Sequence, residues 1–400
     1  MELLKEKEKC CGCRVCEKVC PKSAITMEED ENGFLYPHID EQKCIDCGLC
    51  LKKCAFQSGY KTRKEFEPSY GYAARHKNFA TMMKSRSGGA FPVLSDIILK
   101  EHGVIYGCGY DETEGFYKVV HKKAQNRVQR DEFCGSKYVQ SDLGNVFPEL
   151  KEELEKGTKV LFSGTGCQVG ALHTYLGKEY ENLITVDIVC HGVPSPKIWR
   201  EFLHMREKET HGKITDVDFR DKGRYGWKAH WESLTIDGEK MSSQLYRKIF
   251  SMAVATRPSC FQCVYANKNR PGDITLADFW GHEKAVPGFY DDDKGLSLVL
   301  VHTSKGKQLW DQAQEAMDTV DCTGYPYRHT NMKRPTSRPE RYEEFWEDYH
   351  THGFDYIMKK YCNYEVVSYE ERKRRDRVEN RKNLLKNWKK RVKSFLKQGK

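Results

Sequence analysis

Runs of apolar and polar residues in the middle of the chain predict helices and strands in alternation. Apolar residues recur at helical spacing over residues 146–157, and Gly157 ends this run. The apolar stretch 159–163 predicts a buried strand, residues 164–176 turn from it into a helix, and residues 183–189 predict the next strand. This order is a βαβ unit, in which we expect the two strands to be parallel.

The same periodicity extends to both sides of this unit. Residues 70–74 and 104–106 are typical of strands, and an amphipathic helix is predicted between them over residues 90–101. A further strand runs through Ile274. The polar segment 57–68 predicts a linker ahead of these elements. We therefore expect an α/β body, in a chain that is α+β overall.

The end of the chain combines strong basicity with an apolar stripe. Residues 370–400 hold fourteen lysines and arginines against four acidic residues, whereas the rest of the chain is nearly neutral. Because the body has no excess of positive charge, we expect no nucleic-acid partner. A helix over 366–400 suits two arrangements, packing on the body or lying on an anionic membrane surface, and both stay open. The stripe consists of Val378, Leu385, Trp388, Val392 and Phe395.

Cysteine usage indicates a reducing compartment. The chain has 17 cysteines, but its start, MELLKEKEKC, lacks the apolar stretch of a signal peptide. Its longest apolar runs are too short to span a bilayer. Clustered thiols in a reducing compartment bind metal rather than form disulfides. We expect a cytoplasmic protein, placed against the inner face of the membrane if the basic helix binds lipid.

One cysteine pattern occurs twice near the start of the chain. Each copy reads C-x2-C-x2-C-x3-C, followed by Pro21 in the first copy and by Ala55 in the second. Three thiolates of such a run bind one 4Fe–4S cube and the fourth reaches the other cube, whereas a zinc site would leave a third cysteine surplus. Cys11 is then a spare thiol. The expected ligands are Cys10, Cys13, Cys16 and Cys54 for one cluster, and Cys44, Cys47, Cys50 and Cys20 for the other.

Four more cysteines lie where an α/β sheet binds ligands. Cys167 follows the carboxyl end of the first strand of the βαβ unit, and Cys190 follows the second. Ligands of open α/β sheets bind outside these ends. Together with the C-x2-C pair Cys260 and Cys263, these residues complete four thiolates. They are either ligands of a third 4Fe–4S cluster or buried structural cysteines, and we favour the cluster.

We expect no nicotinamide site at the glycines of residues 164–170. Their spacing is one residue longer than that of the dinucleotide fingerprint, and the second strand ends in Cys190 and His191 instead of an acidic residue. The amides of Gly164 and Thr165 remain available to a flavin. His191 is the candidate proton donor.

Six segments, in order, carry a resemblance to a known family: SGGAF (87–91), GSKYVQS (135–141), GTGCQ (164–168), CHGVPSP (190–196), GDITLADFWG (272–281) and DDDKGLSLVLVHT (291–303). The chain resembles the family of coenzyme F420 hydrogenase and dehydrogenase beta subunits, which includes plant 7-hydroxymethyl chlorophyll a reductase, fused behind a two-cluster ferredoxin domain. The resemblance implies FAD in the α/β body, close to the cluster of Cys167, Cys190, Cys260 and Cys263. It implies that the flavin is lined by Ser87, Gly88, Gly89, Lys137, Gly164 and Thr165.

The expected domains are a bacterial-type ferredoxin domain at 1–60, a flavin-binding domain at 69–145, a domain with the third cluster at 146–330, and the basic helix at 366–400. The resemblance implies that such a chain is an iron–sulfur flavoprotein oxidoreductase. Single electrons from ferredoxin or another low-potential donor reach FAD through the clusters, and FAD exchanges a hydride with a small organic substrate. Two alternatives stay open, a component of an F420-dependent (deazaflavin) oxidoreductase and a non-catalytic electron-transfer subunit of a larger complex.

Overall fold

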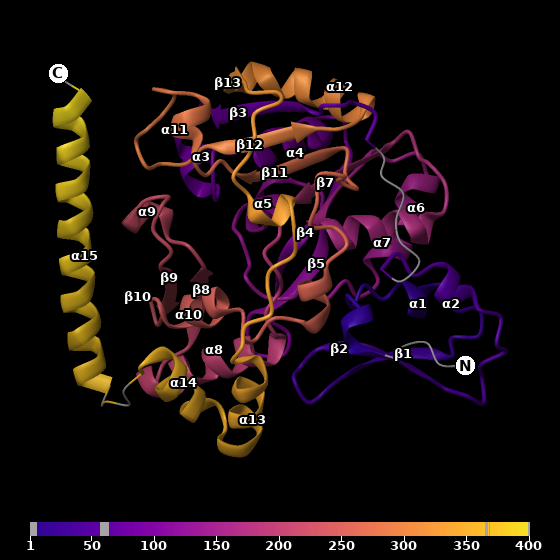
Figure 1. The fold of residues 1–400 in the computed structure, drawn as a ribbon, viewed down its shortest axis with the longest axis horizontal. Helices are drawn as coiled ribbons and strands as arrows, with labels where there is room; N and C mark the ends of the chain where they lie inside the picture. The colour runs from indigo at the N-terminus through magenta and orange to yellow at the C-terminus, as the bar shows by residue number, and fades with distance from the viewer. Residues whose placement is uncertain (1–5, 57–63, 365–366, 368, 399–400) are drawn as a thin grey trace.

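The structure, a computed structural model, describes residues 6–56, 64–364, 367 and 369–398, with side chains up to residue 393. Most of the predicted linker at 57–68 therefore lies outside the described residues. Figure 1 shows a small N-terminal lobe, a central sheet covered by helices, and a long C-terminal helix on the side of the molecule away from that lobe. This mixed α/β architecture confirms the expected fold class.

The central sheet has eight strands, and its middle is parallel. The four strands β11, β7, β6 and β4 run parallel to one another, and antiparallel strands complete the sheet on both sides. The parallel pairing of β6 with β7 confirms the predicted βαβ unit. In spatial order the strands are β13 (Met317–Asp321), β3 (Tyr70–His76), β12 (Ser297–Val301), β11 (Ile274–Asp278), β7 (Leu183–Ile188), β6 (Val160–Thr165), β4 (Val104–Asp111) and β5 (Lys118–Ala124).

Helices cover both faces of this sheet because its strands are apolar on both sides. Along β6, Leu161 packs in the core under α4 (Ala90–Lys100) and α12 (Ser304–Ala313). Its neighbour Phe162 packs in the opposite core under α6 (Val146–Glu155) and α7 (Gly166–Leu176). Successive side chains of a strand point to opposite faces, so one continuous apolar run contributes to two cores.

The turn from β6 into α7 is fixed by a capping box. The side chain of Thr165 accepts a hydrogen bond from the third helical residue, and the Thr165 amide donates to Oε1 of Gln168 at 2.9 Å. The helix ends at Gly177, whose φ of 69° is left-handed. This local chemistry places Cys167 in the first turn of α7, at the carboxyl edge of the sheet.

A second core lies beside the central sheet. It packs α8 (Pro196–Thr210) against the three-stranded sheet β8 (Ile214–Asp218), β9 (Glu232–Ile236) and β10 (Glu239–Ser243). Other helices of this region are α9 (Lys222–Tyr225), α10 (Leu245–Met252), η3 (Pro258–Gln262), α13 (Tyr342–His352), α14 (Phe354–Cys362) and α15 (Tyr369–Gln398). Short helices elsewhere are α3 (Phe79–Lys84), α5 (Arg127–Asp131), η2 (Glu132–Cys134), α11 (His282–Ala285), η4 (Gln314–Ala316) and η5 (Thr330–Met332).

The N-terminal lobe repeats one backbone shape. It contains the hairpin of β1 (Ile25–Glu29) and β2 (Leu35–Ile39), preceded by η1 (Lys7–Lys9), with a short helix at the third cysteine of each run. Gly12 and Arg14 in the first copy, and Asp46 and Gly48 in the second, all have positive φ. The two cysteine runs therefore fold alike, although glycine stands at a different place in each. The short helices are α1 (Val15–Lys18) and α2 (Leu49–Lys52).

Candidate iron–sulfur and flavin site

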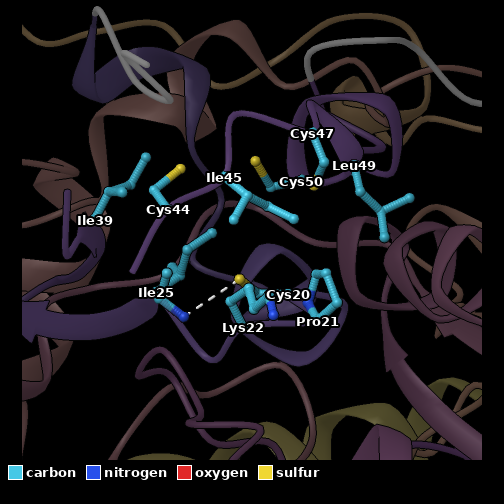
Figure 2. Close-up of a pocket in the computed structure, with 11 residues that line it drawn as sticks. Cys20, Pro21, Lys22, Ile25, Ile39, Cys44, Ile45, Cys47, Leu49 and Cys50 are labelled. Carbon is cyan, nitrogen blue, oxygen red and sulfur yellow. Dashed lines mark hydrogen bonds between the residues drawn. The ribbon is translucent and has the colours of Figure 1, made fainter. Parts of the chain in front are cut away.

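The four thiols expected to hold the second cluster line one recess of the N-terminal lobe, whose walls are apolar side chains such as Ile25, Ile39 and Leu49 (Figure 2). Burial raises the pKa of Cys50, and the nearby sulfurs of Cys47 and Cys20 raise it further. The recess lies at the surface, because Cys47 is exposed. The structure thus brings together Cys20, Cys44, Cys47 and Cys50, which we call the outer thiol set.

The thiols expected to hold the first cluster also face one another. Burial raises the pKa of Cys16, and charges on its neighbours Cys13, Cys10 and Cys54 raise it further. The first cysteine run is held against the body by Arg14, whose guanidinium binds both carboxylate oxygens of Asp142 at 2.5 and 3.0 Å. We call Cys10, Cys13, Cys16 and Cys54 the middle thiol set.

The four remaining candidate ligands meet in one cavity at the carboxyl edge of the central sheet. Cys167 and Cys190 come from the ends of β6 and β7, and Cys260 and Cys263 come from η3 and its end. Burial raises the pKa of Cys260, and the sulfurs of the other three cysteines raise it further. The structure therefore brings together cysteines from three separate segments, which we call the inner thiol set.

Cys11 is a fifth cysteine in this cavity, which the sequence interpretation treated as a spare. Its thiol hydrogen-bonds to the sulfurs of both Cys13 and Cys167, and the bond to Cys167 lowers the pKa of that residue. Cys11 therefore lies between the middle and inner thiol sets. The available signal was its departure from the repeat, since Ile45 stands at the equivalent place in the second copy.

Arg257 is a second residue that the sequence interpretation missed. Its side chain is fully buried and lines the cavity of the inner set. Nε donates to the carbonyl of Cys10 at 2.7 Å, and Nη2 lies 3.5 Å from the sulfur of that residue. Nη1 donates to Oε1 of Gln140 in the body at 3.0 Å. A fixed positive charge therefore stands between the middle and inner thiol sets.

The residues that the resemblance assigns to the flavin lie in separate places. Ser87 and Gly88 hydrogen-bond to the start of β12. Oγ of Ser87 donates to the carbonyl of Leu296 at 2.7 Å, and the amide of Gly88 donates to Oγ of Ser297 at 3.0 Å. Gly88 is packed so closely that a Cβ would lie 2.2 Å from the carbonyl oxygen of Ala74. Gly89 begins α4 with a φ of 87°. These three residues form a tight turn against β3 and β12.

The other assigned flavin residues lie nearer the cysteines or apart from both groups. Oγ1 of Thr165 lies 3.1 Å from the sulfur of Cys167, and Gly164 precedes it at the end of β6. The ammonium of Lys137 donates to the carbonyl of Gly135 at 3.2 Å, and burial lowers its pKa. His191, the candidate proton donor, is exposed and follows Cys190 directly.

Arginines with unused hydrogen-bond donors lie around His230, and one of them, Arg86, directly precedes the turn at Ser87. Among the described residues, Nε and Nη2 of Arg86 and Nε of Arg220 and Arg247 are buried without a hydrogen-bond partner. Burial and the charge of Arg86 lower the pKa of Lys222 to about 7, and its ammonium donates to the Ser87 carbonyl at 2.9 Å. Buried donors normally find acceptors, so this region has the chemistry of a site for an anionic group.

Two carboxylates, Asp218 and Asp278, partly balance these cations, since both lie near Arg86. Oδ2 of Asp278, at the end of β11, accepts from Nη1 of Arg220 at 2.6 Å. Burial alone would raise the pKa of Asp278, but Arg220 and Arg86 hold it at about 2. Burial and the nearby Arg220 and Arg247 charges lower the pKa of His230 to about 3, so this imidazole is neutral. We call the group formed by Arg86, Arg220, Arg247 and Lys222 the cationic region.

Two family models match the chain. Residues 157–322 match the C terminus of the coenzyme F420 hydrogenase/dehydrogenase beta subunit, and residues 9–58 match a 4Fe-4S dicluster domain. One subunit of the F(420)H(2) dehydrogenase of Methanosarcina mazei is 23% identical over 331 residues, which cover 78% of this chain and 84% of that protein. An uncharacterized ferredoxin of Methanocaldococcus jannaschii is 39% identical over 54 residues, 14% of this chain and 69% of that protein.

A solved structure is also similar to part of the chain. It is the F420-reducing [NiFe] hydrogenase complex from Methanosarcina barkeri, with a TM-score of 0.41 and 19% identity. The similarity covers 63% of this chain and 82% of the matched chain.

Proposed function

Since this chain carries the C-terminal domain of the coenzyme F420 hydrogenase/dehydrogenase beta subunit behind a 4Fe–4S dicluster domain, we propose that it is an FAD-dependent oxidoreductase with three 4Fe–4S clusters. A bound flavin supplies the ability to exchange single electrons with iron and a hydride with an organic substrate. The remaining features of the proposal follow from the positions of the chain's own residues.

The meeting of the four inner thiols is the observation that carries the proposal. These residues come from separate segments, yet they line one cavity with Cys11. Structural cysteines scattered through a core have no reason to converge in this way. Four converging thiolates are the ligand set of a 4Fe–4S cluster.

The exposure of the thiol sets indicates an order of electron transfer. The outer set has its rim at the surface, where Cys47 is exposed, so a ferredoxin or another low-potential donor has access to it. In the middle set, Cys16 is buried and lies near Cys54. Cys13 of this set contacts Cys11, which in turn contacts Cys167 of the inner set. Electrons would therefore pass from the outer to the middle and then to the inner site.

The cationic region fits the diphosphate of FAD. The unpartnered donors of Arg86 and Arg220 require acceptors that the described residues do not provide, and phosphate oxygens are strong acceptors. The turn at Ser87 adjoins this region through Lys222. In this proposal Arg86, Arg220 and Lys222 hold the diphosphate, together with Ser87, Gly88 and Gly89. Lys137, Gly164 and Thr165 would contact the flavin toward the inner set, where His191 is the proposed proton donor.

Iron and flavin content per chain, measured on protein purified without oxygen, tests the proposal. We expect about twelve irons and one FAD. About eight irons with one FAD would support a reductase with two clusters, and the inner thiols would then be structural cysteines. Iron without flavin would overturn the reductase and leave an electron relay within a larger complex.

A second candidate is an oxidoreductase that uses coenzyme F420. The similarity to one component of an F(420)H(2) dehydrogenase favours it, because it extends over 84% of that protein. Purified flavin-loaded protein should then bind F420 and reduce or oxidise it. Absence of both binding and turnover would exclude this candidate and leave another organic substrate.

A further inference from the structure

The C-terminal helix α15 contacts the body through polar side chains. The less exposed positions recur every three or four residues, at 373, 376, 380, 383 and 387, which defines one side of the helix. Salt bridges and hydrogen bonds connect this side to α8, α9 and β10. The contacts join Arg372 to Glu209, Asp376 to Arg206, Lys373 to Glu239, and Asn380 and Asn387 to Tyr225.

The apolar stripe of α15 faces away from these contacts. Val378 is 47% exposed, Leu385 58%, Trp388 61% and Val392 37%. The side chain of Phe395 lies outside the described residues. A surface helix normally turns its apolar side toward the core and its polar side toward water. In α15 this arrangement is reversed, so the body is not what covers the stripe.

The stripe is bordered by exposed basic residues. Arg381, Lys382 and Lys389 are exposed beside it, and residues 370–400 hold fourteen lysines and arginines against four acidic residues. Apolar side chains flanked by many cations match a surface that is both apolar and anionic. A second copy of the chain would bring two strongly basic helices together, and their repulsion opposes such a dimer.

We propose that α15 is a docking surface for an anionic lipid membrane. The side chains of Leu385, Trp388 and Val392 insert at the level of the headgroups, and the flanking lysines and arginines bind lipid phosphates. Among the described residues, no helix is long and apolar enough to cross a bilayer. In this proposal α15 lies on the surface of the membrane. This inference is independent of the proposed redox function.

The position of α15 keeps the outer thiol set accessible. In Figure 1 the helix lies along one side of the molecule, and the N-terminal lobe lies at the other. A membrane that contacts the stripe would therefore not cover the exposed rim at Cys47. A soluble electron donor could reach the lobe of the bound protein.

Flotation of the full-length protein with lipid vesicles tests this proposal. We expect binding to vesicles with about one-third phosphatidylglycerol in phosphatidylcholine, and at least about tenfold weaker partitioning onto pure phosphatidylcholine. Raising the salt to about 0.5 M should also weaken binding, because screening reduces attraction between exposed charges. Tryptophan emission should shift to shorter wavelength on binding as Trp388 leaves water.

Paired variants separate the two parts of the surface. Leu385→Glu with Trp388→Glu replaces two apolar side chains of the stripe by carboxylates. Arg381→Glu with Lys389→Glu reverses two of the flanking positive charges. Each pair should lower partitioning by at least about tenfold. Val128→Glu is the matched control, because Val128 is 85% exposed on α5 but lies outside the stripe. Unchanged iron content and visible spectrum would show that each variant is folded.

Several outcomes would overturn the proposal. The proposal is wrong if the wild-type protein does not float with anionic vesicles. It is also wrong if the Leu385→Glu/Trp388→Glu variant floats as well as wild type. A lipid-free wild-type dimer that this variant converts to monomer would assign the stripe to a second copy instead. Binding that Val128→Glu weakens equally would show a non-specific effect of charge.

Discussion

Replacing Arg257 tests whether one buried charge controls the electron path between the lobe and the body. Its guanidinium is fully buried, lies 3.5 Å from the sulfur of Cys10 and lines the cavity of the inner thiols. Reduction of a cluster adds a negative charge, which a nearby cation stabilises. Arg257→Gln removes this cation, so the reduction potential of the middle site should fall.

The expected size of the shift follows from Coulomb's law. For a guanidinium roughly 6 Å from the added charge, with an effective dielectric constant of about 20, the interaction is about 3 kcal/mol. A one-electron couple changes by about 59 mV for each 1.4 kcal/mol, so the potential should fall by on the order of 100 mV. The inner site should shift in the same direction, because Arg257 also faces its cavity.

A redox titration monitored by electron paramagnetic resonance measures this shift. Arg257→Lys is the matched control, since it keeps the charge but loses the fork that binds Cys10, Leu35 and Gln140. The lysine variant should stay much closer to the wild-type potential. A glutamine variant that keeps its full iron content and its wild-type potential would refute the electrostatic role of Arg257.

Three further outcomes are expected from other sites. Cys190→Ala should remove about four irons per chain because the proposed inner cluster would lose a ligand, whereas Cys11→Ala should keep them, as iron analysis of both variants would show. Asp187→Asn removes the counter-charge that lies 2.6 Å from the buried guanidinium of Arg270, so urea denaturation should show a loss of about 3–5 kcal/mol. Burial raises the pKa of Glu232 from about 4.5 to about 7. The folded state therefore binds the proton more tightly, and stability should fall as pH rises through this interval. Melting temperatures of Glu232→Gln should lose this pH dependence, and an unchanged profile would contradict the assignment.

Local patterns in the sequence predicted much of the fold and the thiol sets. The βαβ unit follows from the apolar run of β6, the capping box at Thr165 and the apolar run of β7, all of which act over short distances along the chain. The position of Cys167 and Cys190 then follows from the rule that parallel strands end at one edge. The doubled cysteine run predicted the grouping of the outer thiols for the same reason, because its spacing fixes its own loop.

Residues whose role depends on contacts between distant segments could not be predicted in this way. Arg257 binds Cys10 and Gln140, which are far from it in sequence, and a lone arginine carries no signal of such contacts. The same holds for Arg86 and Arg220, which meet through tertiary packing. The stripe of α15 predicted a helix, but the usual rule for amphipathic helices would have turned that stripe toward the body.

The lobe and the body are joined at the edge of the sheet where the inner thiols lie. Arg14 binds Asp142, and Arg257 binds the backbone of Cys10, so buried and half-buried charges hold the first cysteine run in one place on the body. In the proposed electron path, fusion within one chain replaces a diffusional encounter between the middle and inner sites, because the effective concentration of a tethered partner is high. Under that proposal, disrupting Arg14 alone should slow electron transfer between the two sites without loss of iron, whereas a freely tethered lobe would be insensitive to that change.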